Sequence, residues 1–258
     1  MRTRALCLMT VLACFAIGSA QESHNHAAKK SAIEKDVDPL ALHVLKAATD
    51  PIKQSQAFSF RALVSREHLG SNGQIITLFH VSDVTVQRPD KIHIEFRGRG
   101  KTVQMFYNAG QSVLYTPSEK LYTTISGPNN IDATLADLEK RDVFIPISNF
   151  LESDPYQSLA DDVTTGYVVG KVMLFDQEVH HLAFTEPDAE WQLWVIGGEH
   201  PQVRRMEIID NSKPERPRIA IDFLDWNLNA TPTPDLFTFQ KPADAQQIDL
   251  LKQAATKK

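Results

Sequence analysis

The sequence between Glu178 and Asn229 decides the fold. It contains four runs rich in β-branched, aromatic and leucine residues: VHHLAF (179–184), EWQLWVI (190–196), QVRRMEII (202–209) and RIAIDFLDWNL (218–228). The segments between them, TEPDA, GGEHP and DNSKPERP, are rich in Gly, Pro, Asp and Asn, which are typical of turns. Short apolar runs between such turns are typical of consecutive antiparallel strands. All three tryptophans, Trp191, Trp194 and Trp226, lie here, so this stretch predicts one wall of a large curved sheet.

The residues before Gly127 predict a second antiparallel meander. Apolar and polar residues alternate from Phe58 to Ser65, and Asn72-Gly73 follows, the dipeptide best suited to a tight hairpin turn. The other runs of this meander are IITLFHVSDVTVQ (75–87), KIHIEFRG (91–98), KTVQMFYN (101–108), SVLYT (112–116) and KLYTTI (120–125). A further run, GYVVGKVML (166–174), begins the second half of the sheet. The fold class is therefore expected to be mainly β (α+β), with about eleven strands.

Two segments have helical rather than strand spacing. DPLALHVLKAATDPIKQSQ predicts an N-terminal helix with Asp38 as N-cap, an apolar face that includes Leu40, and an end or bend at Pro51. Residues 128–160 predict a helical insert between the two sheet halves, with Asn129 or Asn130 as its first cap and Asp154-Pro155 before its last helix. The apolar face of residues 131–160 must cover something, and we expect it to act as a lid.

The first twenty residues are expected to be a secretory signal peptide. MRTR is followed by the thirteen-residue apolar run ALCLMTVLACFAI and by Gly18-Ser19-Ala20, which predicts cleavage after Ala20 and a periplasmic product. Val11-Leu12-Ala13-Cys14 loosely resembles a lipobox, so lipid anchoring at Cys14 is the alternative, although Leu12 fits that motif poorly.

The rest of the chain is expected to form a single domain. Residues 21–37 are polar and predict a flexible leader, residues 38–249 the folded domain, and residues 250–258 a C-terminal tail. Removing Arg2 and Arg4 with the signal peptide leaves 25 basic against 32 acidic residues. This negative balance argues against a nucleic-acid partner, and no later run is long enough to predict a transmembrane span.

No sequence motif of a catalytic site is present. The chain lacks a G-x-S-x-G elbow, an H-E-x-x-H zinc motif, a P-loop and a G-x-G-x-x-G fingerprint. Both cysteines, Cys7 and Cys14, lie in the expected signal peptide. His180 and His181 are adjacent on a predicted strand, so their side chains leave opposite faces and cannot bind one ion together. We therefore expect no catalytic residue, no metal site and no cofactor.

Two groups of charged residues have a structural and a functional interpretation. Asp83 lies in the middle of a predicted strand, where a buried, functional carboxylate is the alternative to an outward-facing one. Asp222 and Asp225 are three residues apart on a strand, which predicts that they face opposite sides. Arg204-Arg205 is interpreted as a solvated basic edge.

The order of these motifs also resembles a known family. The most distinctive stretches are SDVTVQRPDKI (82–92) and DLFTFQKP (235–242), with LYTP-x-x-KLY, YVVGKVMLFDQEVHHLAF and LDWNLN between them. Over about residues 38–249 the chain resembles predicted periplasmic proteins known only as a domain of unknown function, in the superfamily of lipoprotein carriers (LolA- and LolB-like). The resemblance implies a half-open antiparallel β-barrel with a helical lid over an apolar cavity, which in the carriers holds acyl chains. It implies no catalytic residue.

We therefore expect a non-enzymatic protein that binds a lipid or lipoprotein acyl chain. The candidate cavity residues are Phe60, Val64, Ile94, Phe96, Val103, Met105, Leu193 and Val195 from strands, with Leu135 and Phe150 from the lid. If the lid fills the concavity, the same residues form a closed core. The alternatives are an envelope protein-interaction or regulatory module without a lipid ligand and, thirdly, an unrecognised hydrolase.

Overall fold

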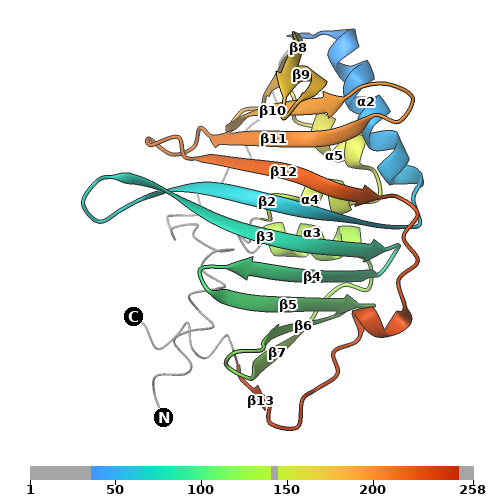
Figure 1. The fold of residues 1–258 in the computed structure, drawn as a ribbon, viewed down its shortest axis with the longest axis vertical. Helices are drawn as coiled ribbons and strands as arrows, with labels where there is room; N and C mark the ends of the chain where they lie inside the picture. Colours follow the sequence, from blue (N-terminus) through green and yellow to red (C-terminus); the bar gives the residue numbers. More distant parts are fainter. Residues whose placement is uncertain (1–35, 141–144, 250–258) are drawn as a thin grey trace.

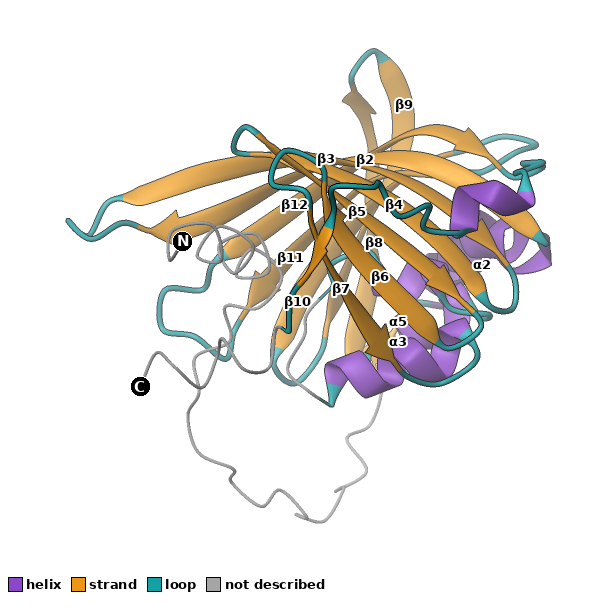
Figure 2. Cartoon of the chain, turned by 90° about the horizontal axis from the view of Figure 1, so that it is seen from below, coloured by secondary structure: helices purple, strands orange, loops and turns teal. Residues whose placement is uncertain are grey.

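The computed structural model describes residues 36–140 and 145–249. These residues form one 13-stranded sheet, in the order β1-β8-β9-β10-β11-β12-β2-β3-β4-β5-β6-β7-β13. The sheet curls into a half-open barrel, and helices lie against its concave side (Figures 1 and 2). The expected signal peptide, most of the leader and the C-terminal tail lie outside the described residues.

The first sheet half is the predicted meander. Its strands are β2 (Ala57–Leu69), β3 (Ile75–Gln87), β4 (Lys91–Gly98), β5 (Lys101–Asn108), β6 (Gln111–Thr116) and β7 (Leu121–Ser126), each antiparallel to the next. The turn between β2 and β3 is the predicted one: Gly73 has a φ of +81°, and Asn72 Oδ1 accepts a hydrogen bond from the Gln74 N–H at 3.1 Å. This conformation suits glycine because it has no Cβ.

The second sheet half confirms the strands of the opening stretch. Its strands are β8 (Thr165–Leu174), β9 (Gln177–Thr185), β10 (Ala189–Ile196), β11 (Gln202–Asp210) and β12 (Arg218–Asn227). β12 pairs with β2 in an antiparallel ladder that places Ile221 opposite Val64. This ladder joins the two halves into a single sheet.

Two-residue strands extend both edges of the sheet. β1 (Asp36–Val37) runs parallel to β8, and β13 (Gln246–Gln247) runs parallel to β7. Asp36 and Val37, the last two residues of the expected leader, thus belong to the sheet, and the Asp36 backbone N–H donates to Thr164 O at 2.9 Å. These two short strands account for the difference between the predicted eleven strands and the observed 13.

The N-terminal helix begins as predicted but ends later. In α2 (Pro39–Gln54), Asp38 Oδ1 accepts a hydrogen bond from the Leu40 N–H at 2.8 Å. Pro51 lies inside the last turn, where its missing N–H costs the helix a single backbone bond. Of the two predicted outcomes, an end or a bend at Pro51, the end is therefore wrong. Leu40 is 55% exposed rather than part of the apolar face, because Ala41 and Leu45 face the sheet instead.

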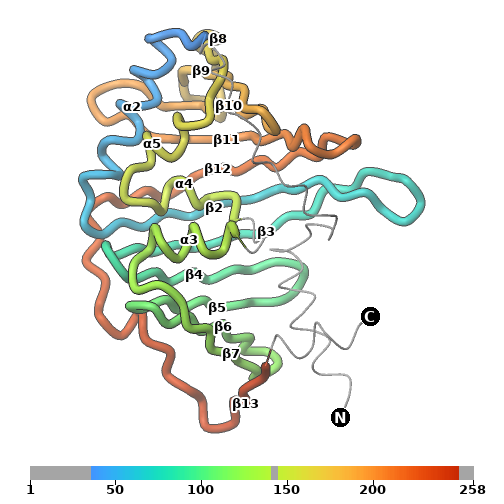
Figure 3. Tube along the Cα trace, turned by 180° about the vertical axis from the view of Figure 1, so that it is seen from behind, coloured from blue at the N-terminus to red at the C-terminus, as the bar shows by residue number. Residues whose placement is uncertain are grey.

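The insert forms three short helices, α3 (Ile131–Glu139), α4 (Ser148–Leu151) and α5 (Pro155–Ala160). Asn130 Oδ1 accepts a hydrogen bond from the Ala133 N–H at 2.8 Å, and Asp154 Oδ1 accepts one from the Gln157 N–H at 3.2 Å, which confirms both predicted caps. Seen from behind, these helices and α2 cover one side of the concave face (Figure 3). Across residues 36–140 and 145–249, no helix combines the length and apolar character needed to cross a bilayer.

The cap of α3 gives a test of the lid's local stability. Asn130→Ala removes the hydrogen bond to the Ala133 N–H, and we expect it to lower the free energy of unfolding by about 1 kcal/mol. Asn129→Ala is the matched control, because exposed Asn129 makes no cap bond, and it should change stability by less than about 0.5 kcal/mol. If chemical denaturation gave the same loss in the free energy of unfolding for both variants, it would contradict the assigned cap.

Candidate functional site

The concave face carries all ten predicted cavity residues, in two groups. Seven belong to one buried cluster that also contains side chains of all four helices: Phe60, Val64, Ile94, Leu193, Val195, Leu135 and Phe150. Met105 is partly buried against that cluster. Phe96 and Val103 are buried too but lie outside it. The structure therefore brings most of the predicted residues together.

Beneath the helices the concave face is a packed core. Phe150 of α4 is fully buried, and its ring meets Phe223 edge-on at 4.8 Å. Phe60 lies 5.6 Å from Phe223 and 4.5 Å from Trp226. The alternative stated from the sequence, that the helices fill the concavity, therefore describes this part of the face. Phe223 and Trp226 are central to it but are absent from the predicted set.

A bulge in β12 explains why the sequence pattern did not place Trp226 among the cavity residues. The pairing of β12 with β2 shifts register between Leu224 and Asn227, and Asp225 takes a φ of +53°. This irregularity turns Trp226 toward Phe60, and its indole N–H donates to Val203 O at 2.9 Å. A bulge inserts one residue and reverses the alternation beyond it, so a strict period of two cannot place this side chain.

The concave face continues beyond the helices. Val64 pairs with His80, and Phe96 pairs with Val103 across β4 and β5. The His80 and Phe96 rings lie 4.4 Å apart, which links the two pairs. The helices α2 to α5 occupy the other side of the face (Figures 2 and 3). These four side chains therefore form an apolar surface with one titratable member.

His80 is held in its neutral form. Its pKa is lowered from 6.5 to about 4, first because burial disfavours the charged imidazolium and second because Arg66 is nearby. At pH 7 this part of the concave face consequently carries no charge from His80. An uncharged imidazole beside Phe96 is compatible with an apolar ligand.

The lid is tied to the sheet by hydrogen bonds at two places. Arg88, in the turn between β3 and β4, donates to Leu151 O at 3.0 Å and to Glu152 O at 2.6 Å. Tyr107 of β5 donates to Pro128 O at 2.9 Å and accepts from the Thr134 hydroxyl at 3.0 Å. The first tie holds the end of α4, and the second holds the start of α3.

The lid is also tied to α2 and to itself. Lys53 of α2 forms an ion pair with Asp154 at 2.5 Å. Within the insert, Asp132 accepts hydrogen bonds from the Ser153 N–H at 2.9 Å and from its hydroxyl. Strand-to-strand ladders, by contrast, run the length of the sheet. The lid can therefore separate from the sheet more readily than the strands can separate from one another.

Asp83 faces outward, on the convex side. It accepts hydrogen bonds from Arg61 at 2.6 Å and from Arg97 at 2.5 Å. Burial alone would raise the pKa of Asp83, but these hydrogen bonds outweigh it and hold the pKa below its usual value. A carboxylate fixed between two guanidinium groups is a structural ion pair and is poorly suited to accept a proton.

The prediction that Asp222 and Asp225 face opposite sides is wrong. Asp222 pairs with Arg205 at 2.8 Å, and Asp225 lies 3.3 Å from Arg61, so both carboxylates face the convex side. The reason is again the register shift at Asp225, which adds one residue to β12. Each carboxylate is matched by an arginine.

The prediction of a solvated edge at Arg204-Arg205 is also wrong. Their side chains are 13% and 21% exposed. Arg204 donates to Phe223 O at 3.1 Å, and Arg205 packs over the Trp194 ring at 5.9 Å. The arginines lie on a central strand, and the long aliphatic parts of such side chains pack well on a sheet.

The neighbouring histidines have separate structural surroundings. His181 hydrogen-bonds Gln192 at 2.8 Å and stacks on Trp194 at 4.4 Å. His180 pairs instead with Val195 on the adjacent strand. Across the part of the chain that the structure describes, no group of three or more His, Cys, Asp or Glu residues has the arrangement of a metal site.

The lowered pKa of His80 predicts a pH dependence of stability. The unfolded chain takes up this proton near pH 6.5 and the folded protein only near pH 4. The free energy of unfolding should therefore fall as the pH drops through this window, by about 2 kcal/mol from this residue between pH 7 and 4.5. His80→Phe, which keeps a ring beside Phe96, should remove that part of the fall. Urea titrations at several pH values measure the free energy of unfolding, and the exposed His68→Phe control should show the same fall with pH as the wild type. A wild-type fall with pH in His80→Phe would contradict the assignment.

Comparisons with known proteins gave a family match and structural neighbours of low sequence identity. The search of curated proteins gave no match. Among solved structures, LprF from Mycobacterium bovis is similar at 13% identity and a TM-score of 0.46, covering 76% of this chain and 98% of that one. The lipoprotein LppX from Mycobacterium tuberculosis is similar at 10% identity and a TM-score of 0.44, covering 75% and 98%. The LolA superfamily protein NE2245 from Nitrosomonas europaea is similar at 12% identity and 0.32, covering 77% and 97%.

A family model covers almost the whole described domain. It matches residues 41–251, from α2 to beyond β13. The family is described as predicted periplasmic protein (DUF2092). Because the match spans well over half of the chain, the protein belongs to this family of predicted periplasmic proteins.

Proposed function

We propose that this member of the family is a non-enzymatic periplasmic protein that binds an apolar ligand, a lipid or lipoprotein acyl chain, on the concave face of its half-barrel. The observation that carries the proposal is the run of apolar side chains Val64, Phe96 and Val103 on the concave side of the sheet, in which Phe96 and Val103 lie outside the cluster that the helices share. Concave apolar surfaces with few polar groups are typical of small-molecule sites.

The polar groups of this region favour an uncharged chain. His80 is neutral at pH 7, and Ser82, opposite Phe96, is buried. A methylene chain laid against Phe96 and Val103 would gain about 0.8 kcal/mol for each CH₂ group removed from water. From there the chain would continue past Met105 and Ile94 toward the aromatic core.

The burial of the lid and the burial of a long acyl chain are comparable in free energy. Seven buried lid side chains belong to the core: Ile131, Leu135, Ile145, Ile147, Phe150, Leu151 and Leu159. At ~2 kcal/mol each, their burial contributes about 14 kcal/mol, while a chain of about 14 methylene groups gains about 11 kcal/mol. An acyl chain of this length can therefore compensate for most of the lid contacts that it replaces.

A non-enzymatic role is supported by the state of the charged groups. Asp83 and Asp222, two carboxylates of the central strands, are both paired with arginines on the convex face. His80, the titratable group of the concave surface, has no carboxylate among the groups that shift its pKa. A general base normally needs such an orienting partner within hydrogen-bonding distance.

The proposal predicts saturable binding of a fluorescent long-chain fatty acid to protein purified from the periplasm. Met105→Glu places a carboxylate on the concave face at a partly exposed position, where it would be desolvated by the bound chain. We expect it to weaken binding by at least about tenfold. Equilibrium fluorescence titration measures the affinity, and thermal unfolding checks that the variant is folded.

Met173→Glu is the matched control for this experiment. Met173 is 69% exposed on β8, which lies next to the edge strand β1 and far in the strand order from β5. The same chemical change there should leave the affinity unchanged. The proposal fails if the wild type takes up no fatty acid and also carries no lipid in native mass spectrometry. A protein-interaction module would give that result.

A further inference from the structure

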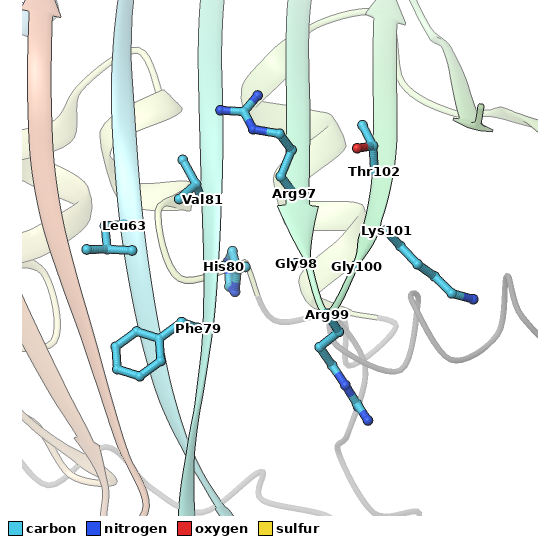
Figure 4. Close-up of a pocket in the computed structure, with 10 residues that line it drawn as sticks. All are labelled: Leu63, Phe79, His80, Val81, Arg97, Gly98, Arg99, Gly100, Lys101 and Thr102. Carbon is cyan, nitrogen blue, oxygen red and sulfur yellow. The ribbon is translucent and has the colours of Figure 1, made fainter. Parts of the chain in front are cut away.

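A second recessed surface lies on the convex face, where β4 turns into β5. A pocket of about 460 Å³ there is lined by Leu63, Phe79, His80, Val81, Arg97, Gly98, Arg99, Gly100, Lys101 and Thr102. These residues lie on the neighbouring strands β2, β3, β4 and β5 and on the turn between β4 and β5 (Figure 4). The volume is within the range of about 300–1,000 Å³ that is usual for small-molecule sites.

This pocket is separate from the concave face. Leu63 alternates along β2 with Ala62 and Val64, which are buried on the concave side. Val81 and Arg97 lie beside it in register on β3 and β4, so all three side chains point to the convex side. His80 and Gly98 face the concave side, where the His80 ring lies beside Phe96, and they border the pocket where it reaches the plane of the sheet. The sheet therefore separates a ligand here from the concave surface.

One wall of the pocket is apolar and continues along the β2–β3 hairpin. Phe79 is 60% exposed beside Leu63 and Val81. Ile75 and Leu69, which pair with each other, are 57% and 47% exposed on the same face of the hairpin. This stretch projects beyond the rest of the sheet (Figure 1). Together these side chains form an exposed apolar stripe that ends in the pocket.

The other wall is basic. Arg97 is fixed by Asp83 and Glu95, each at 2.5 Å, and Lys101 by Glu119 at 2.9 Å. Arg99 extends from the turn into solvent, and the structure gives it no ion pair with any described residue. In a chain of net charge −5, an exposed and uncompensated arginine at the rim of an apolar pocket favours an anion.

We propose that this pocket binds a single-chain amphiphilic anion, with its carboxylate or phosphate head at Arg99 and its tail along Phe79, Ile75 and Leu69. The carboxylates of Asp83 and Glu95 repel an anionic head near Arg97 and so direct it to the turn. Such a ligand comes either from free monomers or from the surface of an anionic bilayer, and both present the same chemistry. The proposal goes beyond concave-face binding and does not depend on it.

The test uses the Met105→Glu protein, in which the concave site is disabled. Dodecanoate, dodecyl phosphate and uncharged dodecyl maltoside, each below its micellar concentration, are titrated calorimetrically. Vesicles of phosphatidylglycerol and of phosphatidylcholine are compared by co-sedimentation. We expect binding of the anionic probes or of the anionic vesicles, weakened by added salt. Binding in the calorimetric titrations would identify free monomers as the source of the ligand, and binding in the co-sedimentation would identify a bilayer.

Matched variants separate the site from general effects of charge and hydrophobicity. Arg99→Glu should weaken binding by about tenfold or more, while Arg216→Glu, another exposed arginine at a turn with positive φ, should change it less than about twofold. Phe79→Ser should also weaken binding, whereas Phe175→Ser, at 59% exposure, should not. Arg99→Lys should retain most of the affinity.

Three outcomes would overturn the proposal. The first is that no anionic probe or vesicle binds the Met105→Glu protein. The second is an equal loss in Arg99→Glu and Arg216→Glu, which would indicate a response to net charge. The third is that dodecyl maltoside binds as tightly as the anions. If concave-face binding alone fails, the wild type still binds fatty acid, Met105→Glu does not weaken that binding and Arg99→Glu does. The two failures are therefore distinguishable.

Discussion

The pairing of β12 with β2 is the interaction on which the rest of the structure depends. It joins residues far apart in sequence, from Ile219 opposite Arg66 to Asn227 opposite Ser59. Without it the chain would form two separate meanders, each too small to curl around a core. With it, one continuous sheet curves far enough to have an inside, and the insert between β7 and β8 is brought against that inside. The concave face, the lid and the aromatic core all follow from this one ladder.

The concave face then serves two purposes. Where the helices cover it, Phe150, Phe223 and Phe60 make a closed core that stabilises the fold. Beyond the helices the same alternation of side chains continues through Phe96 and Val103. An apolar surface that the lid does not share is the physical basis for assigning a ligand to this side. The convex face differs, because its charged side chains are matched in arginine–carboxylate pairs across neighbouring strands.

Local sequence patterns predicted the strands, the Asn72-Gly73 turn and the lid caps, because these depend on near neighbours in the chain. They could not predict the bulge at Asp225, which places Asp225 on the same face as Asp222 and turns Trp226 toward Phe60. A bulge depends on how two strands fit together rather than on either strand alone. Pro51 was misjudged for a related reason, since packing of α2 on the sheet outweighs one lost backbone bond.

The candidate site, too, could be predicted only as far as it depends on residues near one another in the chain. Periodicity correctly grouped side chains that share a face of one strand, such as Phe60 with Val64. It could not show which of them the helices would cover, because that depends on where the insert lies in space. The convex pocket was invisible for the same reason: Leu63, Val81 and Arg97 come from three strands and meet only through register.

The most direct test of the concave-face account is photo-crosslinking with a fatty acid that carries a diazirine near its methyl end, read at residue resolution by tandem mass spectrometry. The account predicts saturable labelling of Val64, Phe96, Val103 or Met105, which competes with unlabelled fatty acid. Labelling confined to the convex face or to the outer surface of the lid, or labelling that does not saturate, would contradict it.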